Sequence, residues 1–218
     1  MRVTPHRPER PPGRSREGEP RRFDAVTIAL HWTTAALIAG MFASAWLHVV
    51  AEGGRYANLL LAIHRSLGLS VWVVAACRLG WRLRFGYLPP FPPGMSKPKQ
   101  TLAKASEYSL YALLLLQPLT GLAQSLTRGR PFLLFALQAP VVMARNVGLT
   151  ALLAAVHRYS AWALLGLVGV HALAALHHRF VLHDDILQSM LPWKPAMRPA
   201  SGAKIFNRAR LRPMKREA

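Results

Sequence analysis

The chain has almost no cysteine. Its 218 residues include only Cys77. A single cysteine excludes disulfides within the chain, cysteine-rich zinc sites, iron–sulfur clusters and the covalent haem attachment of a C-x-x-C-H motif. Any haem must therefore be held by histidine or methionine side chains.

Charged residues are scarce in four long stretches of a chain that is 52% hydrophobic. Each stretch reaches the ~20 residues that a membrane-spanning helix needs. The stretches are residues 25–50, 59–83, 105–127 and 149–178. We therefore predict an all-α fold, a four-transmembrane-helix bundle. It divides into a disordered basic N-terminal tail (1–22), a four-helix membrane domain (23–195) and a basic cytoplasmic C-terminal tail (196–218).

Acidic residues are also few, and the basic residues gather on one side of such a bundle. The chain has 28 Lys and Arg against 9 Asp and Glu, a net charge of +19. The basic residues assigned to the other side are Arg55, Arg65, Arg128, Arg130, Arg145 and Arg158. Because cytoplasmic segments are enriched in Lys and Arg, both termini are predicted to be cytoplasmic. The tails are interpreted as topology signals that touch anionic membrane lipid, and no nucleic-acid partner is expected.

The connections between the stretches carry further predictions. Asp24 or Thr27 is expected to cap the first helix. The proline-rich segment Tyr87–Lys99 is expected to be a stiff inner loop without helix. On the outer side, the apolar segment Pro131–Leu137 is too short to span and is expected to lie on the membrane interface.

Two histidines on the last stretch, His157 and His171, are fourteen residues apart. On an α-helix they return to within about 40° of one face and lie ~21 Å apart along the axis. Two earlier stretches also carry a histidine, His31 and His64. The alternating direction of the spans pairs His31 with His171 near the inner side, and His64 with His157 near the outer side.

Four imidazoles at two depths suggest two iron sites, each a haem b held by two histidines in a four-helix bundle. A single histidine in a membrane helix is otherwise a packing residue or part of a proton relay. Zinc is the weaker alternative, because two imidazoles without cysteine or carboxylate leave a tetrahedral site incomplete. Arg78 lies fourteen residues after His64, which places it on the same helix face near the depth of the inner pair. It either pairs with a propionate of the inner haem or is a basic residue that only sets the orientation of the protein in the membrane.

Several motifs resemble the prokaryotic cytochrome b-561 family over roughly residues 20–195. They are F-D-A-V-T-I-A-L-H-W around His31, I-H-R-S-L-G-L around His64, R-L-G-W-R-L from Arg78, Q-P-L-T-G-L from Gln117, H-R-Y-S and G-V-H-A-L-A-A-L-H-H around His157 and His171, and L-x-x-M-L-P-W ending at Trp193. The resemblance implies a multi-pass protein of the bacterial inner (plasma) membrane. It also implies that His31, His64, His157 and His171 are the axial haem ligands.

The resemblance further implies electron exchange with the quinone pool, and similar members oxidise superoxide and reduce ubiquinone. No catalytic side chain beyond the haems is expected. One departure is visible, since this chain has Lys104 and Glu107 where related sequences often carry a histidine. Outer arginines are expected to attract superoxide; these are Arg55, Arg128, Arg130 and Arg158. The alternative function is a non-catalytic cytochrome b subunit that passes electrons for a hydrogenase or other dehydrogenase and binds a redox partner protein.

Overall fold

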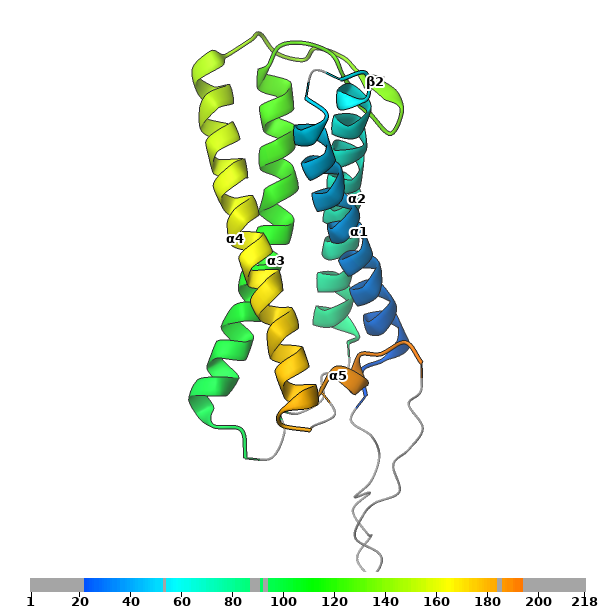
Figure 1. The fold of residues 1–218 in the computed structure, drawn as a ribbon, viewed down its shortest axis with the longest axis vertical. Helices are drawn as coiled ribbons and strands as arrows, with labels where there is room; N and C mark the ends of the chain where they lie inside the picture. The colour runs from blue at the N-terminus through cyan, green and yellow to red at the C-terminus, as the bar shows by residue number, and fades with distance from the viewer. Residues whose placement is uncertain (1–21, 53, 87–90, 92–93, 184–185, 194–218) are drawn as a thin grey trace, which may run out of the picture.

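The computed structural model describes residues 22–52, 54–86, 91, 94–183 and 186–193. Within these ranges four long helices run side by side, and a short helix lies at one end (Figure 1). The helices are α1 (Ala25–Val50), α2 (Ala57–Arg84), α3 (Lys97–Thr127), α4 (Val147–Phe180) and α5 (Ile186–Ser189). Both predicted tails fall outside the described residues, apart from Arg22.

Three of the helices, α1, α2 and α4, are long and apolar enough to cross a membrane. Helix α3 has 31 residues but contains Pro118 and polar side chains such as Gln117 and Ser125. Gln117 and Ser125 are both buried, so these polar groups of α3 are turned away from the surface of the protein.

The helix starts follow ordinary capping chemistry. Asp24 caps α1, because its carboxylate accepts a hydrogen bond from the backbone N–H of Thr27 at 2.9 Å. Asn146 caps α4 in the same way. The prediction of a non-helical segment through Lys99 is wrong at its end, since α3 begins at Lys97. Proline is tolerated in the first turn, where its missing N–H would have no helical partner.

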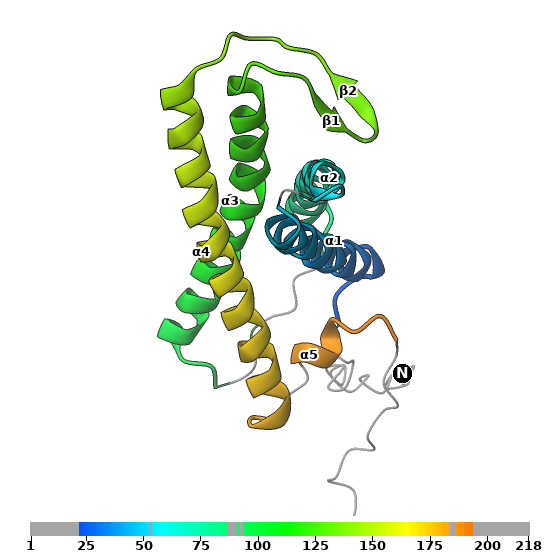
Figure 2. The ribbon, with the colours of Figure 1, turned by 45° about the horizontal axis from the view of Figure 1, so that its top comes forward.

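The long helices form two close pairs, α1 with α2 and α3 with α4, joined through contacts between α2 and α3. Among the described residues α1 and α4 make no comparable contact. Figure 2 shows the two pairs from a second direction. A core of buried apolar side chains ties all four helices together and consists of Met41, Val71, Ala75, Leu114 and Leu164.

The connection between α3 and α4, predicted to lie on the outer side, adds a small β-hairpin to the mostly helical fold. Strands β1 (Phe132–Leu134) and β2 (Leu137–Ala139) pair antiparallel, with Leu134 opposite Leu137. The apolar segment thus forms local backbone hydrogen bonds, and the backbone N–H of Phe135 donates to the Ser66 hydroxyl of α2 at 2.8 Å.

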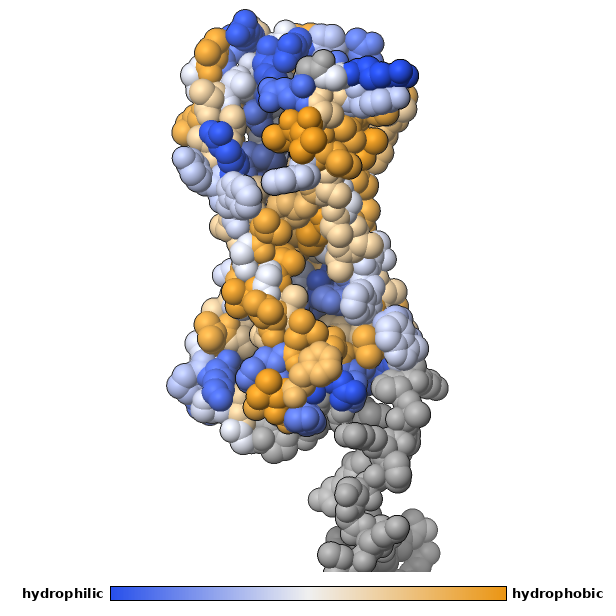
Figure 3. Space-filling model, in the orientation of Figure 1, coloured by the Kyte–Doolittle hydropathy of each residue, from blue (hydrophilic) through white to orange (hydrophobic). Residues whose placement is uncertain are grey.

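The surface of the bundle matches a lipid environment. Apolar residues dominate the middle of the face shown in Figure 3, and polar residues gather toward its two ends. Helix α4 buries only Leu164, while large apolar side chains such as Trp162 and Leu173 are exposed. Monomeric soluble proteins rarely expose so large an apolar surface.

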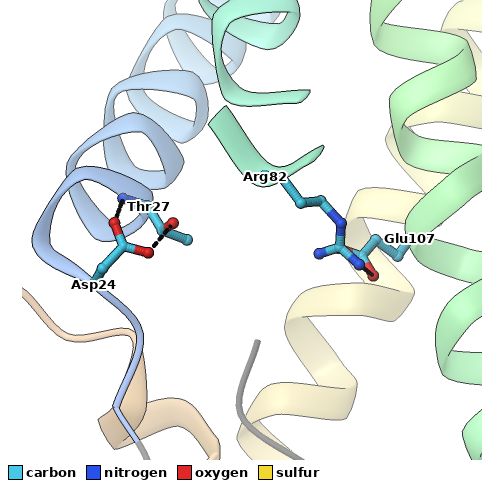
Figure 4. A network of polar contacts seen from close by, with 4 residues as sticks. All are labelled: Asp24, Thr27, Arg82 and Glu107. Atoms are coloured by element: carbon cyan, nitrogen blue, oxygen red, sulfur yellow. Dashed lines mark hydrogen bonds and ion pairs between the residues drawn. The ribbon is translucent and has the colours of Figure 1, made fainter. Parts of the chain in front are cut away.

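The end of the bundle where α1 begins and α2 ends is called the inner end, as the sequence predicts, and the opposite end the outer end. Polar contacts between elements far apart in sequence hold this inner end (Figure 4). Arg82 of α2 and Glu107 of α3 form a two-pronged ion pair. The indole N–H of Trp81 donates to the Asp24 carboxylate at 3.0 Å, which ties the end of α2 to the start of α1. Trp32 donates to the Met190 carbonyl at 2.7 Å and so holds the segment after α5 against α1.

Candidate cofactor sites at two histidine pairs

The outer pair consists of His64 on α2 and His157 on α4. Their ring centroids lie 6.2 Å apart, with the ring planes at 90°. A metal ion between two imidazole nitrogens at about 2 Å from each would separate the centroids by roughly 6 Å. The observed spacing therefore suits a metal held between the two rings.

Backbone contacts orient both outer rings. His64 Nδ1 lies 3.0 Å from the Met41 carbonyl oxygen, and His157 Nδ1 lies 3.1 Å from the Gln117 carbonyl oxygen. A carbonyl oxygen only accepts, so each Nδ1 is the protonated nitrogen and Nε2 keeps its lone pair. Metal-ligating histidines commonly donate their second nitrogen to a carbonyl in this way.

Helix α3 supplies the rest of the support around His157. The Gln117 amide donates to the His157 carbonyl at 2.7 Å, and the Thr120 hydroxyl lies 3.0 Å from His157 Nδ1. A Cβ placed on Gly121 would lie 2.9 Å from His157 Cε1. Glycine is therefore required at 121 for α3 to approach the ring this closely.

The inner pair consists of His31 on α1 and His171 on α4. Their ring centroids lie 6.3 Å apart, with the planes at 59°. His31 Nδ1 is buried and has no hydrogen-bond partner among the described residues, and His171 is an exposed residue on the side of α4. The inner pair thus has the spacing of the outer pair but not its backbone contacts.

Arg78 lies at the same end of the bundle. Its guanidinium stands over the Tyr111 ring, 5.5 Å from the ring centroid. Its Nε is buried without a hydrogen-bond partner in the described part of the chain. Glu107 pairs with Arg82, and Arg78 forms no ion pair within the described residues.

Three further histidines of the described residues make contacts outside these pairs. His48 contacts the Ala57 carbonyl at 2.8 Å, where α1 and α2 are joined. His177 and His178 contact each other at the inner end of α4.

The two pairs fit haem better than a free metal ion. The described residues contain no group of three or more histidine, cysteine or acidic side chains that could hold a metal ion. Haem supplies four equatorial nitrogens and needs only two axial ligands from the protein.

The spacing of the histidines was visible in the sequence, but their supporting contacts were not. The contacts of the Met41 and Gln117 backbone carbonyls do not depend on the side chain, so the sequence could not predict them. In the sequence, the contact of Thr120 with His157 is signalled only by a hydroxyl residue next to Gly121.

A mostly helical membrane protein with two histidine pairs that link different helices has the architecture of a membrane-bound cytochrome b. The family model for prokaryotic cytochrome b561 matches residues 22–193. The chain therefore belongs to the prokaryotic cytochrome b561 family, a family of membrane electron-transfer proteins, and membership implies that it binds haem b. It is a bacterial membrane protein.

Curated relatives are similar over most of their length. Cytochrome b561 homolog 2 of Escherichia coli K12 is 29% identical over 175 residues, covering 79% of this chain and 92% of the relative. The probable superoxide oxidase CybB of Yersinia pestis is 30% identical over 177 residues, covering 80% and 98%. Cytochrome b561 homolog 1 of E. coli K12 is 29% identical over 177 residues, covering 78% and 97%.

Proposed function

We propose that this chain is a diheme superoxide:ubiquinone oxidoreductase of the bacterial inner membrane, with four spanning helices and both termini in the cytoplasm. Helix α3 serves as the fourth span, and its contacts support that role. Backbone and polar groups inside a bilayer need partners within the protein. Gln117 meets this need by bonding both the His157 carbonyl and the Ser160 hydroxyl of α4.

The observation that carries the proposal is that two histidines of α4 each contact a histidine of another helix. His157 meets His64, and His171 meets His31, each at a centroid distance near 6 Å. The two pairs are joined by α4 and separated along it by ~21 Å. His64 and His157 are proposed to hold the outer haem b, and His31 and His171 the inner one.

Bound haem supplies one-electron exchange at each site. The protein sets the environment between the sites, where Met41, Val71 and Leu164 form part of a buried apolar layer. An apolar layer excludes water and keeps small charged species from crossing. The overall reaction oxidises two superoxide anions to dioxygen on the outer side. It reduces one ubiquinone to ubiquinol with two protons from the cytoplasmic side.

Arg78 is proposed to bind a propionate of the inner haem. It is half-buried and forms no ion pair within the described residues, as noted above. An arginine in a low-dielectric setting is stabilised by a carboxylate that accepts two hydrogen bonds from it.

The outer arginines are proposed to attract superoxide. Arg128 and Arg130 lie at the outer end of α3, and Arg55 and Arg158 stand beside Tyr56 and Tyr159. Such a field raises the local concentration of an anion and weakens as salt screens it. The name of the Yersinia pestis relative, probable superoxide oxidase, agrees with this substrate.

The test combines a spectrum with an activity measurement. Purified protein in lipid nanodiscs should show about two haem b per chain by haemochrome quantitation. With an enzymatic superoxide source and ubiquinone it should form ubiquinol well above the uncatalysed rate, and the rate should fall as ionic strength rises. Arg55→Gln should lower this rate at low ionic strength. Arg145→Gln is its matched control, since Arg145 is also exposed and is not one of the arginines proposed to attract superoxide. Two haems without ubiquinol formation would contradict the catalytic proposal and favour the electron-transfer subunit.

A further inference from the structure

A pocket of about 460 Å³ lies at the outer end of the bundle, between the ends of α2 and α3 and the β-hairpin. Its lining includes Asn58, Arg65, Ser125, Arg128, Arg130 and Phe132. It is separate from the space between the histidine rings, although Arg65 follows His64 directly in the chain.

The charges of this pocket are of one sign. Three guanidinium groups line it, from Arg65, Arg128 and Arg130, and none of the lining residues is acidic. The ion pair between Arg82 and Glu107 lies at the opposite end of the bundle, near the end of α2 and the start of α3. Burial, and then the neighbouring charge of Arg130, lower the pKa of Arg128. Like charges gathered in a partly buried site repel one another, and an anion among them removes that cost.

Arg65 is held in place for such an anion. Its Nε donates to the Ser125 hydroxyl at 3.1 Å, and its guanidinium lies 5.2 Å from the centroid of the Phe132 ring. These contacts orient the guanidinium and leave its two terminal nitrogens for a ligand. The planar fork of arginine matches the two oxygens of a carboxylate.

The hairpin and the loop before it shape the pocket at a conformational cost. The hairpin turn places Phe135 and Ala136 in the left-handed region, at φ values of 49° and 62°, where side chains other than glycine and asparagine are disfavoured. Gly129 has φ 61°, and a Cβ there would lie 2.5 Å from the Arg145 backbone nitrogen. This turn brings Arg128 and Arg130 to the pocket. Glycine adopts this conformation freely, so the strained positions are Phe135 and Ala136. Strain at residues other than glycine is concentrated at functional sites.

We propose that this pocket binds a carboxylate or a similar small oxyanion through Arg65, Arg128 and Arg130. The ligand has two possible sources, a propionate of the outer haem or a free anion from the outer aqueous phase. Only the first source rests on the proposed haem at His64 and His157. Haem content, measured separately, therefore distinguishes a failure of that proposal from a failure of this one.

The first experiment tests a free anion. The haem-loaded protein in nanodiscs is titrated with acetate and with inorganic phosphate in a calorimeter at constant ionic strength. If a free anion fills the pocket, the wild-type protein binds at least one of them. Arg65→Gln then weakens binding tenfold or more, and Arg145→Gln changes it less than twofold. Arg130 is exposed, so Arg130→Gln is a second variant that should fold normally and weaken binding severalfold.

The second experiment tests a propionate. Protein is prepared with haem labelled with ¹³C at the propionate carboxyls, and redox difference infrared spectra are recorded. If a propionate fills the pocket, neither acetate nor phosphate binds. Arg65→Gln and Arg130→Gln then shift the labelled carboxylate band, whereas Arg145→Gln does not. Protein with two haems per chain that binds neither anion, and whose labelled band is unmoved in both pocket variants, would overturn the proposal.

Discussion

The outer and inner histidine pairs have nearly the same ring separation but differ in what holds the rings. At the outer pair, backbone carbonyls fix both rings, and Gly121 lets α3 pack against His157. At the inner pair, His31 Nδ1 has no partner among the described residues. The protein alone therefore orients the outer pair, whereas the inner pair depends more on the group that it binds. Support around a metal ligand strengthens binding without adding a ligand.

The largest expected effect separates the two sites. His157→Ala should leave about one haem b per chain, bound at the inner pair, and His171→Ala should leave about one at the outer pair. Each change removes one of the two ligands proposed for that haem, and either should abolish ubiquinol formation. Haemochrome quantitation and reduced-minus-oxidised spectra check this. Loss of both haems in either variant would show that the two sites fold as one unit.

A second change perturbs the outer pair while keeping its ligands. Gly121→Val should displace the His157 ring, because even a Cβ at 121 would lie 2.9 Å from it. Overpacking of this kind costs about 1–3 kcal/mol, so the outer haem should be partly lost or its spectrum broadened. Gly80→Val is the matched control, since a Cβ there would meet nothing within 4 Å. Equal haem loss in both variants would mean that the contact at Gly121 does not matter.

A third change addresses the dependence of the inner pair on its bound group. Arg78→Gln should lower the midpoint potential of the inner haem and weaken its retention, because a positive charge near the propionate is lost. The outer haem should be nearly unaffected. Redox titration of both haems measures this, with the exposed Arg84→Gln as control. Equal effects of the two variants would mean that Arg78 does not bind the propionate and only adds positive charge to the inner end of the bundle.

The smallest expected effect concerns one hydrogen bond of the outer pair. Thr120→Val removes the hydroxyl 3.0 Å from His157 Nδ1 but leaves the Gln117 carbonyl in place. A neutral hydrogen bond contributes about 1 kcal/mol, so the shift in the outer haem potential should be small and haem content unchanged. Haem loss or spectral broadening as large as that expected for Gly121→Val would show that Thr120, and not the carbonyl, orients the ring.

The sequence by itself predicted the long helices and the pairing of the histidines. The bounds of α1 were predicted to the residue, because an apolar run begins directly after the cap Asp24. The pairing His31–His171 and His64–His157 followed from helical spacing and alternating direction, both of which are local properties. Their ligand role stays a prediction, and the apolar composition of α1, α2 and α4 supports three membrane-capable helices.

Tertiary structure decided what surrounds the histidines. The hairpin bonded to Ser66, the carbonyls facing His64 and His157, and the arginine pocket all join residues far apart in the chain. Backbone carbonyls are the same at every residue, so no side-chain pattern marks the ones that orient a ring. Long-range packing selects them. The sequence therefore determined which histidines could meet, and the packing of α3 and the outer hairpin determined how firmly each pair is held.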